Sequence, residues 1–153
     1  MKRLLFLLAC LMTSYTGFSQ KNFWEKTTKE SSSTAQRFQR ATIPSKFEVF
    51  ALDLQGFKTE LRQAPKREAS NSLSTVILNF PNAEGELEAF RIYEAAVMHP
   101  DLQTQFPTIK SYVGVGVENR TSMVRFSTTL FGVHAMLFAG DREVNYIDAY
   151  TND

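Results

Sequence analysis

From residue 75 to the C-terminus, apolar and polar residues alternate in short runs that turn-forming residues separate. A period of two indicates strands with one buried face, because successive side chains of a strand point to opposite sides of a sheet. Turn residues at 81–85, 119–120 and 140–142 favour antiparallel hairpins between these runs. The runs expected to be strands are 75–80, 87–97, 109–117, 122–128, 132–139 and 143–150.

Two short helices are expected beside these strands. The first follows a strand at 46–54, where Asp53 can cap the helix. Its apolar face recurs at helical spacing, at Leu54, Phe57 and Leu61. The second opens at 99–101, with a proline in its first turn, and ends before Pro107. The sequence therefore predicts an α+β fold that is mainly antiparallel β, one domain with about five to seven strands and two short helices.

The composition excludes several classes of protein. Of the 153 residues, 43% are hydrophobic, and 17 Lys and Arg balance 16 Asp and Glu, for a formal net charge of +1. A disordered chain has fewer apolar residues, and a chain that binds nucleic acid usually has a large basic excess. We therefore expect a globular domain without a nucleic-acid partner.

The N-terminus has the three-part plan of a secretory signal peptide. Two basic residues precede an apolar run at 4–12, and small or polar residues follow it. This run is about half the roughly 20 residues that a membrane-spanning helix needs, so cleavage is expected, between Ser19 and Gln20. The alternative is a lipoprotein signal with the lipid on Cys10, which leaves an apolar core of only about six residues, below the usual range.

Cleavage defines a signal peptide at 1–19, a polar N-terminal arm at 20–41 and a β-rich domain at 42–153. The product is expected to be secreted, to the extracellular medium, the cell surface or the periplasm, and to have no membrane attachment after cleavage. Cys10 is the single cysteine of the chain, so no disulfide can stabilise the exported domain. Trp24, in the arm, is consistent with a contact to the core and equally with an anchor to another domain.

Few residues are suited to catalysis or metal binding. The two histidines, His99 and His134, lie far apart in sequence, whereas zinc enzymes of the helical type place two histidines one turn apart. A Ser-His-Asp triad needs a single histidine, so a hydrolase using His134 stays open beside a strand histidine satisfied by a neighbour. Glu84, Glu86 and Glu88 have two interpretations. They form a functional site, as an acid–base pair or a calcium site, or they are solvated charges beside a turn. We expect no cofactor in this chain and no enzymatic activity of its own.

Two further features have competing interpretations. Lys66 and Arg67 lie in a charged loop at 65–72 and form either a protease cleavage site or part of a solvated loop. Gly114 and Gly116 alternate with valines along one strand. Glycine in a strand allows close packing, which we expect from an aromatic ring such as that of Phe126 or Phe138.

An ordered series of segments resembles a known protein family. Its centre is the run at 90–98, with the segments 100–102 and 106–114 after it. Shorter segments extend the likeness on both sides, at 41–44, 48–50, 125–127, 132–136 and 146–150. The series resembles the N-terminal pro-region of large secreted bacterial zinc metalloproteases of the reprolysin-like (metzincin) type, over about residues 40 to 150.

The resemblance implies a non-catalytic pro-domain that assists the folding of a catalytic domain and inhibits it until after export. The parent would be a zinc metalloendopeptidase, the zinc and the active site would belong to the catalytic domain, and this chain would be a fragment without that domain. The mature chain has no cysteine that could block the zinc, because Cys10 would leave with the signal peptide. The candidates for inhibition are therefore His99, Asp101 and the turn at 84–88, or steric cover of the cleft. The alternative is a free-standing exported β-rich binding module with an exposed aromatic patch.

Overall fold

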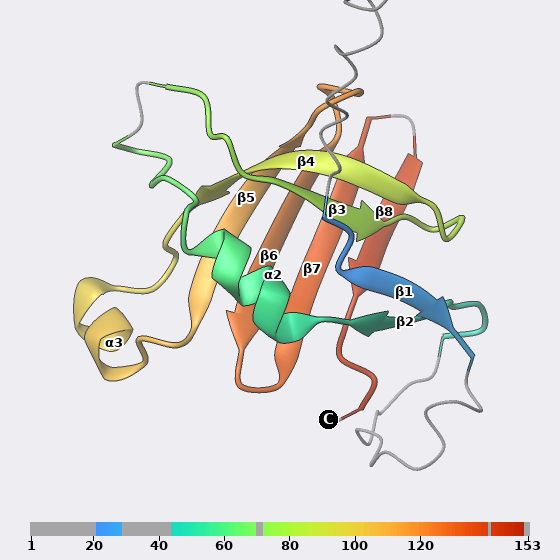
Figure 1. Cartoon of the computed structure of the whole chain (residues 1–153), viewed down its shortest axis with the longest axis horizontal. Coiled ribbons are helices and arrows are strands. Elements are labelled where there is room, and N and C mark those ends of the chain that lie inside the picture. The colour runs from blue at the N-terminus through green and yellow to red at the C-terminus, as the bar shows by residue number, and fades with distance from the viewer. Residues whose placement is uncertain (1–20, 29–43, 70–71, 141, 152–153) are drawn as a thin grey trace, which may run out of the picture.

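A computed structural model describes residues 21–28, 44–69, 72–140 and 142–151 of the chain. Within these residues, eight strands form two antiparallel sheets, and two short helices accompany them (Figure 1). The prediction of a mainly antiparallel β fold with two short helices is confirmed. The expected signal peptide, with Ser19 and Gln20, lies outside the described residues. The elements are β1 (Trp24–Thr27), β2 (Val49–Leu52), α2 (Leu54–Leu61), β3 (Ile77–Pro81), β4 (Leu87–Glu94), α3 (Pro100–Gln105), β5 (Lys110–Gly116), β6 (Met123–Thr129), β7 (Gly132–Ala139) and β8 (Arg142–Ile147).

Strands β3 to β8 form one six-stranded sheet in which each strand pairs with the next along the chain. Short connections suffice for this order because antiparallel neighbours need only a turn between them. In the β3–β4 turn, the side-chain oxygen of Asn82 accepts hydrogen bonds from the backbone amides of Glu84 and Glu86, at 3.0 and 2.9 Å. Gly85 completes this turn with a φ of +82°, which residues with a side chain rarely adopt. The predicted hairpins are thus confirmed.

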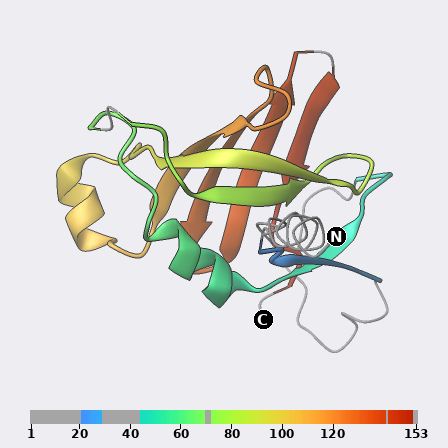
Figure 2. The ribbon, with the colours of Figure 1, turned by 45° about the horizontal axis from the view of Figure 1, so that its top comes forward.

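The sheet coils strongly, so that β3 and the first half of β4 pass over β7 and β8 (Figures 1 and 2). Two contacts between distant strands hold this arrangement. The side-chain amide of Asn145 on β8 donates to the backbone oxygen of Pro81 on β3 at 3.1 Å, and Arg142 pairs with Glu88 on β4 at 2.6 Å. Coiling in one direction follows from the right-handed twist of strands. It encloses one face of the sheet, which we call the inner face, and leaves the other, the outer face, toward solvent.

Helix α2 covers the inner face (Figure 1). As predicted, Asp53 caps it, and its carboxylate accepts a hydrogen bond from the backbone amide of Gly56 at 2.9 Å. Phe57 and Leu61, one turn apart, are the buried residues of the helix. The amphipathic pattern therefore predicts both the helix and the side that packs against the sheet.

Aromatic rings form the centre of the core between α2 and the sheet. The ring of Phe57 is completely buried and contacts those of Phe80 and Phe126, at centroid distances of 5.7 and 5.9 Å. Tyr112 stacks on Phe126 at 5.0 Å. Burial raises the pKa of Tyr112 to about 12, and the carboxylate of Glu94 adds to the shift. Tyr112 is therefore protonated at neutral pH and contributes to packing.

Strand β1 is a feature that the sequence pattern does not predict, since it lies within the polar arm at 20–41. It pairs with β2, and the two form a separate sheet beside α2 (Figure 1). Trp24 is buried against Phe57 and Phe80, and its indole N–H donates to the backbone oxygen of Asn79 on β3 at 2.7 Å. Of the two interpretations of Trp24, the structure shows the contact with the core.

The close packing predicted at the two glycines of β5 is present, but the expected partners are wrong. A Cβ atom at Gly114 would lie 2.6 Å from the side chain of Val124 and 2.7 Å from that of Ile92. At Gly116 the nearest atom is the backbone oxygen of Asn119, in the following turn. Phe126 and Phe138 are not among the nearest neighbours, because the register places Val124 opposite Gly114, Phe126 opposite Tyr112, and Phe138 opposite Met123 on the outer face.

Candidate binding site on the outer sheet face

The outer face carries one continuous row of side chains across five strands. Cross-strand pairing in turn joins Tyr93 to Val113, Val113 to Arg125, Arg125 to Met136 and Met136 to Tyr146. Because partners in register lie side by side on one face, these residues form a band from β4 to β8, which we call the outer row. Alternation predicts that such positions face away from the core, but the register decides which of them become neighbours.

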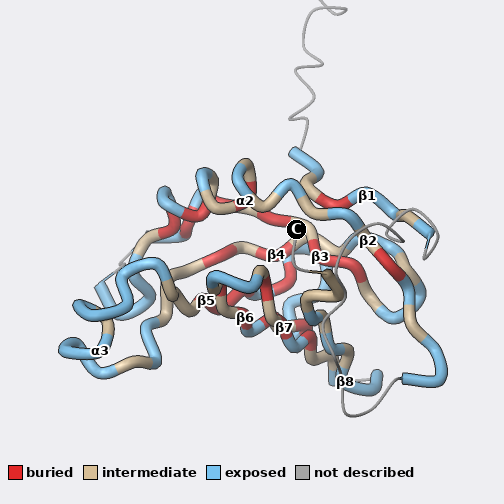
Figure 3. The backbone as a smooth tube through the Cα atoms, turned by 90° about the horizontal axis from the view of Figure 1, so that it is seen from below, coloured by how far each residue is buried: buried red, intermediate tan, exposed pale blue. Residues whose placement is uncertain are grey.

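Several apolar side chains of the outer face remain exposed. Met136 is 37% and Tyr146 63% exposed in the outer row, and Val115, two residues along β5 from Val113 on the same face, is 38% exposed. Val113 itself is buried, at 2% exposed. Figure 3 shows the consequence, with buried stretches between α2 and the sheet and little burial along β8. Met136 and Tyr146 are paired across β7 and β8, and adjacent exposed apolar side chains are more typical of interaction surfaces than single scattered residues are.

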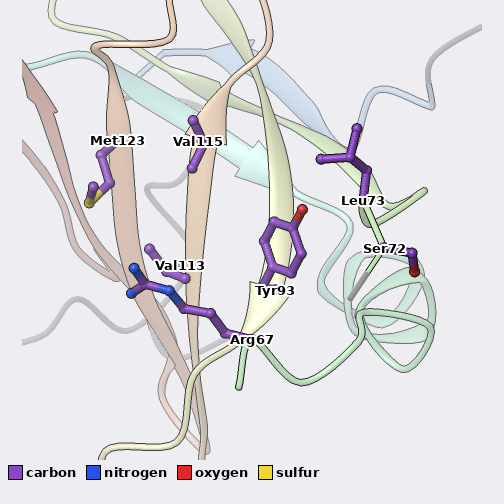
Figure 4. Close-up of a pocket in the computed structure, with 7 residues that line it drawn as sticks. All are labelled: Arg67, Ser72, Leu73, Tyr93, Val113, Val115 and Met123. Atoms are coloured by element: carbon purple, nitrogen blue, oxygen red, sulfur yellow. The ribbon is translucent and has the colours of Figure 1, made fainter. Parts of the chain in front are cut away.

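A pocket of about 340 Å³ opens on the same face, between the sheet and the loop that follows α2 (Figure 4). Its sheet side consists of apolar and aromatic side chains from β4, β5 and β6. Its loop side contributes a guanidinium group, which in Figure 4 reaches toward Val113 and Met123. This volume is at the lower end of the range for ligand pockets. The lining residues are Arg67, Ser72, Leu73, Tyr93, Val113, Val115 and Met123.

Hydrogen bonds to β4 hold the loop in place beside the pocket. The backbone amide of Arg67 donates to the oxygen of Glu94 at 2.9 Å, and the amide of Glu94 donates to Pro65 at 2.9 Å. Further along the loop, the guanidinium of Arg91 donates to the backbone oxygen of Ser74, whose amide donates to the Tyr93 hydroxyl at 3.2 Å. Both described ends of the loop are therefore bound to the same strand, β4.

The charges that the strands present on this face are positive. Along β4 to β7, the outward positions include Arg91 and Arg125 and contain no carboxylate. Arg91 is engaged with Ser74, whereas the guanidinium groups of Arg67 and Arg125 make no hydrogen bond or ion pair with any described residue. An apolar pocket beside two available cations is suited to an apolar group that carries a negative charge.

His134 lies at the border of this surface, next to the outer row. Its Nδ1 atom is 3.0 Å from the carboxylate of Asp148, so the neighbour expected for a strand histidine is present. Ser127 is the cross-strand partner of His134, but among the described residues its hydroxyl bonds that of Ser111 at 3.1 Å. Ser127, His134 and Asp148, the residue types of a catalytic triad, thus lie on the same open face. In the described part of the chain, however, Ser127 makes no hydrogen bond to His134, which a general base requires.

His99 and Asp101, the two inhibitory candidates, lie together at the start of α3. The Nδ1 atom of His99 accepts from the backbone amide of Asp101 and lies 3.4 Å from its carboxylate. Both side chains are exposed, and α3 buries no residue; Leu102 and Phe106, one turn apart, are each about half exposed. The exposure of His99 and Asp101 is what an inhibitory contact with a catalytic domain requires. Their inhibitory role stays a prediction.

The carboxylates at 84–88 form a charged turn rather than a cluster. Glu88 accepts from Arg142 at 2.6 Å and from Asn82 at 3.0 Å, and Glu84 lies 3.9 Å from Arg142. Partial burial raises the pKa of Glu88, but the hydrogen bonds from Arg142 and Asn82 and the charge of Arg142 outweigh it and hold the pKa below its ordinary value. A low pKa keeps Glu88 ionised, which suits its contact between β4 and β8.

Comparison with known proteins gives no relative. No family model, no curated protein and no solved structure matches the chain. The described residues contain no group of three His, Cys, Asp or Glu side chains placed to hold a metal ion. In the same part of the chain, no helix is long and apolar enough to span a membrane.

Proposed function

We propose that this chain is the non-catalytic pro-region of a secreted zinc metalloprotease, with the cognate catalytic domain as its partner. The observation that carries the proposal is the ordered resemblance at 90–98, 100–102 and 106–114 and its continuation at 125–127, 132–136 and 146–150. These segments fall on β4, α3, β5, β6, β7 and β8, which follow one another in the fold. The segment at 48–50 overlaps β2 of the smaller sheet, so the resemblance spans both sheets, with most of its segments on or beside the sheet that carries the outer row.

In this proposal the pro-region supplies a folding surface and an inhibitory contact, while the catalytic domain supplies zinc and chemistry. His99 and Asp101 are exposed at the start of α3, where either could approach a zinc ion as an imidazole or carboxylate ligand. The alternative mode is steric cover of the active-site cleft by the sheet. Export precedes activation, so the protein acts outside the cell or in the periplasm.

Two experiments test this function. The first reads the coding sequence beyond codon 153, where we expect an open frame that continues into a helix with His-Glu-x-x-His spacing. The second refolds the encoded catalytic domain with and without this chain and follows peptide hydrolysis. We expect a higher refolding yield and inhibited hydrolysis. An unchanged yield together with unchanged activity contradicts the proposal.

The inhibitory residue can be identified in the same assay. If α3 blocks the zinc, then His99→Ala or Asp101→Asn relieves inhibition, whereas Gln105→Ala, at an exposed position of the same helix, does not. Equal inhibition by all three variants excludes His99 and Asp101 and leaves the turn at 84–88 or steric cover.

A free-standing exported binding module is the second candidate, and the pocket beside the two arginines is the observation that favours it. A genuine stop codon after codon 153, with no protease sequence downstream, is the result that selects this module over the pro-region.

A further inference from the structure

We propose that the outer row and its pocket form the docking surface for an acidic, apolar surface of the cognate catalytic domain. This inference rests on the proposed function for the identity of the partner. It goes further by assigning the binding to one face of the sheet and by stating the chemistry of the surface that fits it.

The apolar part of the partner is specified by the pocket. Val113, Val115 and Met123 provide its floor, and Leu73, which is 75% exposed, lies on the loop side. The volume of about 340 Å³ suits one or two side chains of a protein surface. Val113 is already buried, at 2% exposed, so a side chain that enters from the partner would mainly cover Leu73 and Val115, which is 38% exposed. Burial of apolar area is the main favourable term in protein association.

The charged part of the partner is specified by Arg67 and Arg125. Arg67 lines the pocket, and Arg125 pairs across the strands with Val113, which also lines it. Asp148, the residue directly after β8, is paired with His134 at 3.0 Å. The guanidinium groups of Arg67 and Arg125 have no partner among the described residues. Carboxylates on the catalytic domain would form hydrogen-bonded ion pairs with them.

Two other occupants fit this charge pattern less well. A second copy that docks through the same face would bring arginines against arginines, which opposes a symmetric dimer. The segment 29–43 of the chain itself carries Lys29, Arg37 and Arg40 against a single carboxylate, Glu30, so its net charge is also positive. An acidic surface on a different protein matches better than either.

The test uses two pairs of matched variants in the full chain, with inhibition of the catalytic domain as the readout. Arg125→Glu reverses a charge in the outer row, and Arg120→Glu does so in the β5–β6 turn, which is also exposed. Leu73→Asp alters the pocket, and Leu130→Asp alters an equally exposed leucine, at 76%, in the β6–β7 turn. Thermal unfolding of each variant confirms that the fold is retained, and Arg125→Gln replaces Arg125→Glu if it is not.

We expect Arg125→Glu and Leu73→Asp each to weaken inhibition about tenfold or more, because each places a negative charge against a surface that is acidic or apolar. The two control variants should change inhibition by less than about twofold. Added salt should weaken the wild-type interaction and have less effect on Arg125→Glu, since the charge attraction is then gone.

The possible outcomes separate this inference from the proposed function. If the wild-type chain neither inhibits nor refolds the catalytic domain, the proposed function fails, and the docking surface fails with it because its partner is that domain. If the wild type acts but all four variants act equally well, the docking surface is wrong while the proposed function stands. Self-association of the wild type that Arg125→Glu abolishes would also contradict it, by showing a second copy as the occupant.

Discussion

The two faces of the six-stranded sheet are built from alternate residues of the same strands, yet they differ in nearly every property. The inner face carries Phe80, Phe90 and Phe126, which α2 and β1 cover. The outer face carries Met136 and Tyr146, which stay exposed. The difference shows that an apolar residue in a strand does not by itself define a core, because the covering element decides which face is buried.

The faces also differ in charge. The inner face is nearly free of cations at its centre, whereas Arg67 and Arg125 border the apolar pocket of the outer face. Removing an apolar side chain from the inner face should therefore affect stability, and altering the outer face should affect binding.

The largest expected effect is at the centre of the inner face. Phe57→Ala removes a ring that contacts Phe80 and Phe126, and it should lower the free energy of unfolding by about 3–5 kcal/mol. Denaturant unfolding measures this change. Leu130→Ala, at an exposed position, is the control and should stay within about 0.5 kcal/mol. Equal effects of the two substitutions would show that α2 does not cover the sheet as described.

Close packing on the inner face predicts the next effect. Gly114→Ala places a Cβ atom within 2.7 Å of Ile92 and closer still to Val124, so it should destabilise the fold by about 1–3 kcal/mol. Gly140→Ala is the matched control, because a Cβ atom there meets no atom within 4 Å. A shift of the thermal midpoint for Gly140→Ala alone would contradict this assignment.

A smaller effect is expected where the coiled sheet closes on itself. The pKa of Glu88 is lowered, and a carboxyl with a lower pKa in the folded state stabilises the fold above its unfolded pKa. This contribution is lost as the pH falls through the folded pKa. Glu88→Gln should therefore lower stability at neutral pH by about 1 kcal/mol or less and make stability less sensitive to acid.

Unfolding measured from pH 7 down to pH 3 provides the test, with Glu86→Gln as the control in the same turn. If both variants keep the acid sensitivity of the wild type, the contact with Arg142 does not contribute to stability.

The smallest change in stability is expected on the outer face. Met136→Thr retains a strand-forming residue and removes apolar surface that is already partly exposed, so the free energy of unfolding should change by less than about 1 kcal/mol. Denaturant unfolding is again the measurement. A loss as large as that for Phe57→Ala would indicate that another element covers the outer face.

Sequence patterns predicted much of the fold because their causes are local. The period of two identifies the strands, Asp53 caps α2, and turn residues such as Gly85 join neighbouring strands. The pattern failed for β1, since four residues of polar sequence with one tryptophan show no clear alternation. Its pairing with β2 and the burial of Trp24 depend on a distant part of the chain.

The candidate site was much less predictable. Arg67 appeared in the sequence as part of a charged loop, and Arg125 as one polar position in a strand. Alternation assigns Arg125 to a face, and no local signal indicates that Val113 is its neighbour or that the loop after α2 lies beside β4.

The sequence by itself determined the mainly antiparallel fold, its hairpins and its capped helix, because these depend on residues that are close together in the chain. The tertiary structure alone decided which glycine contacts which side chain, where the sheet closes, and which residues form the outer row. Those features depend on strand register and on the coil of the sheet, which arise from the packing of all strands together.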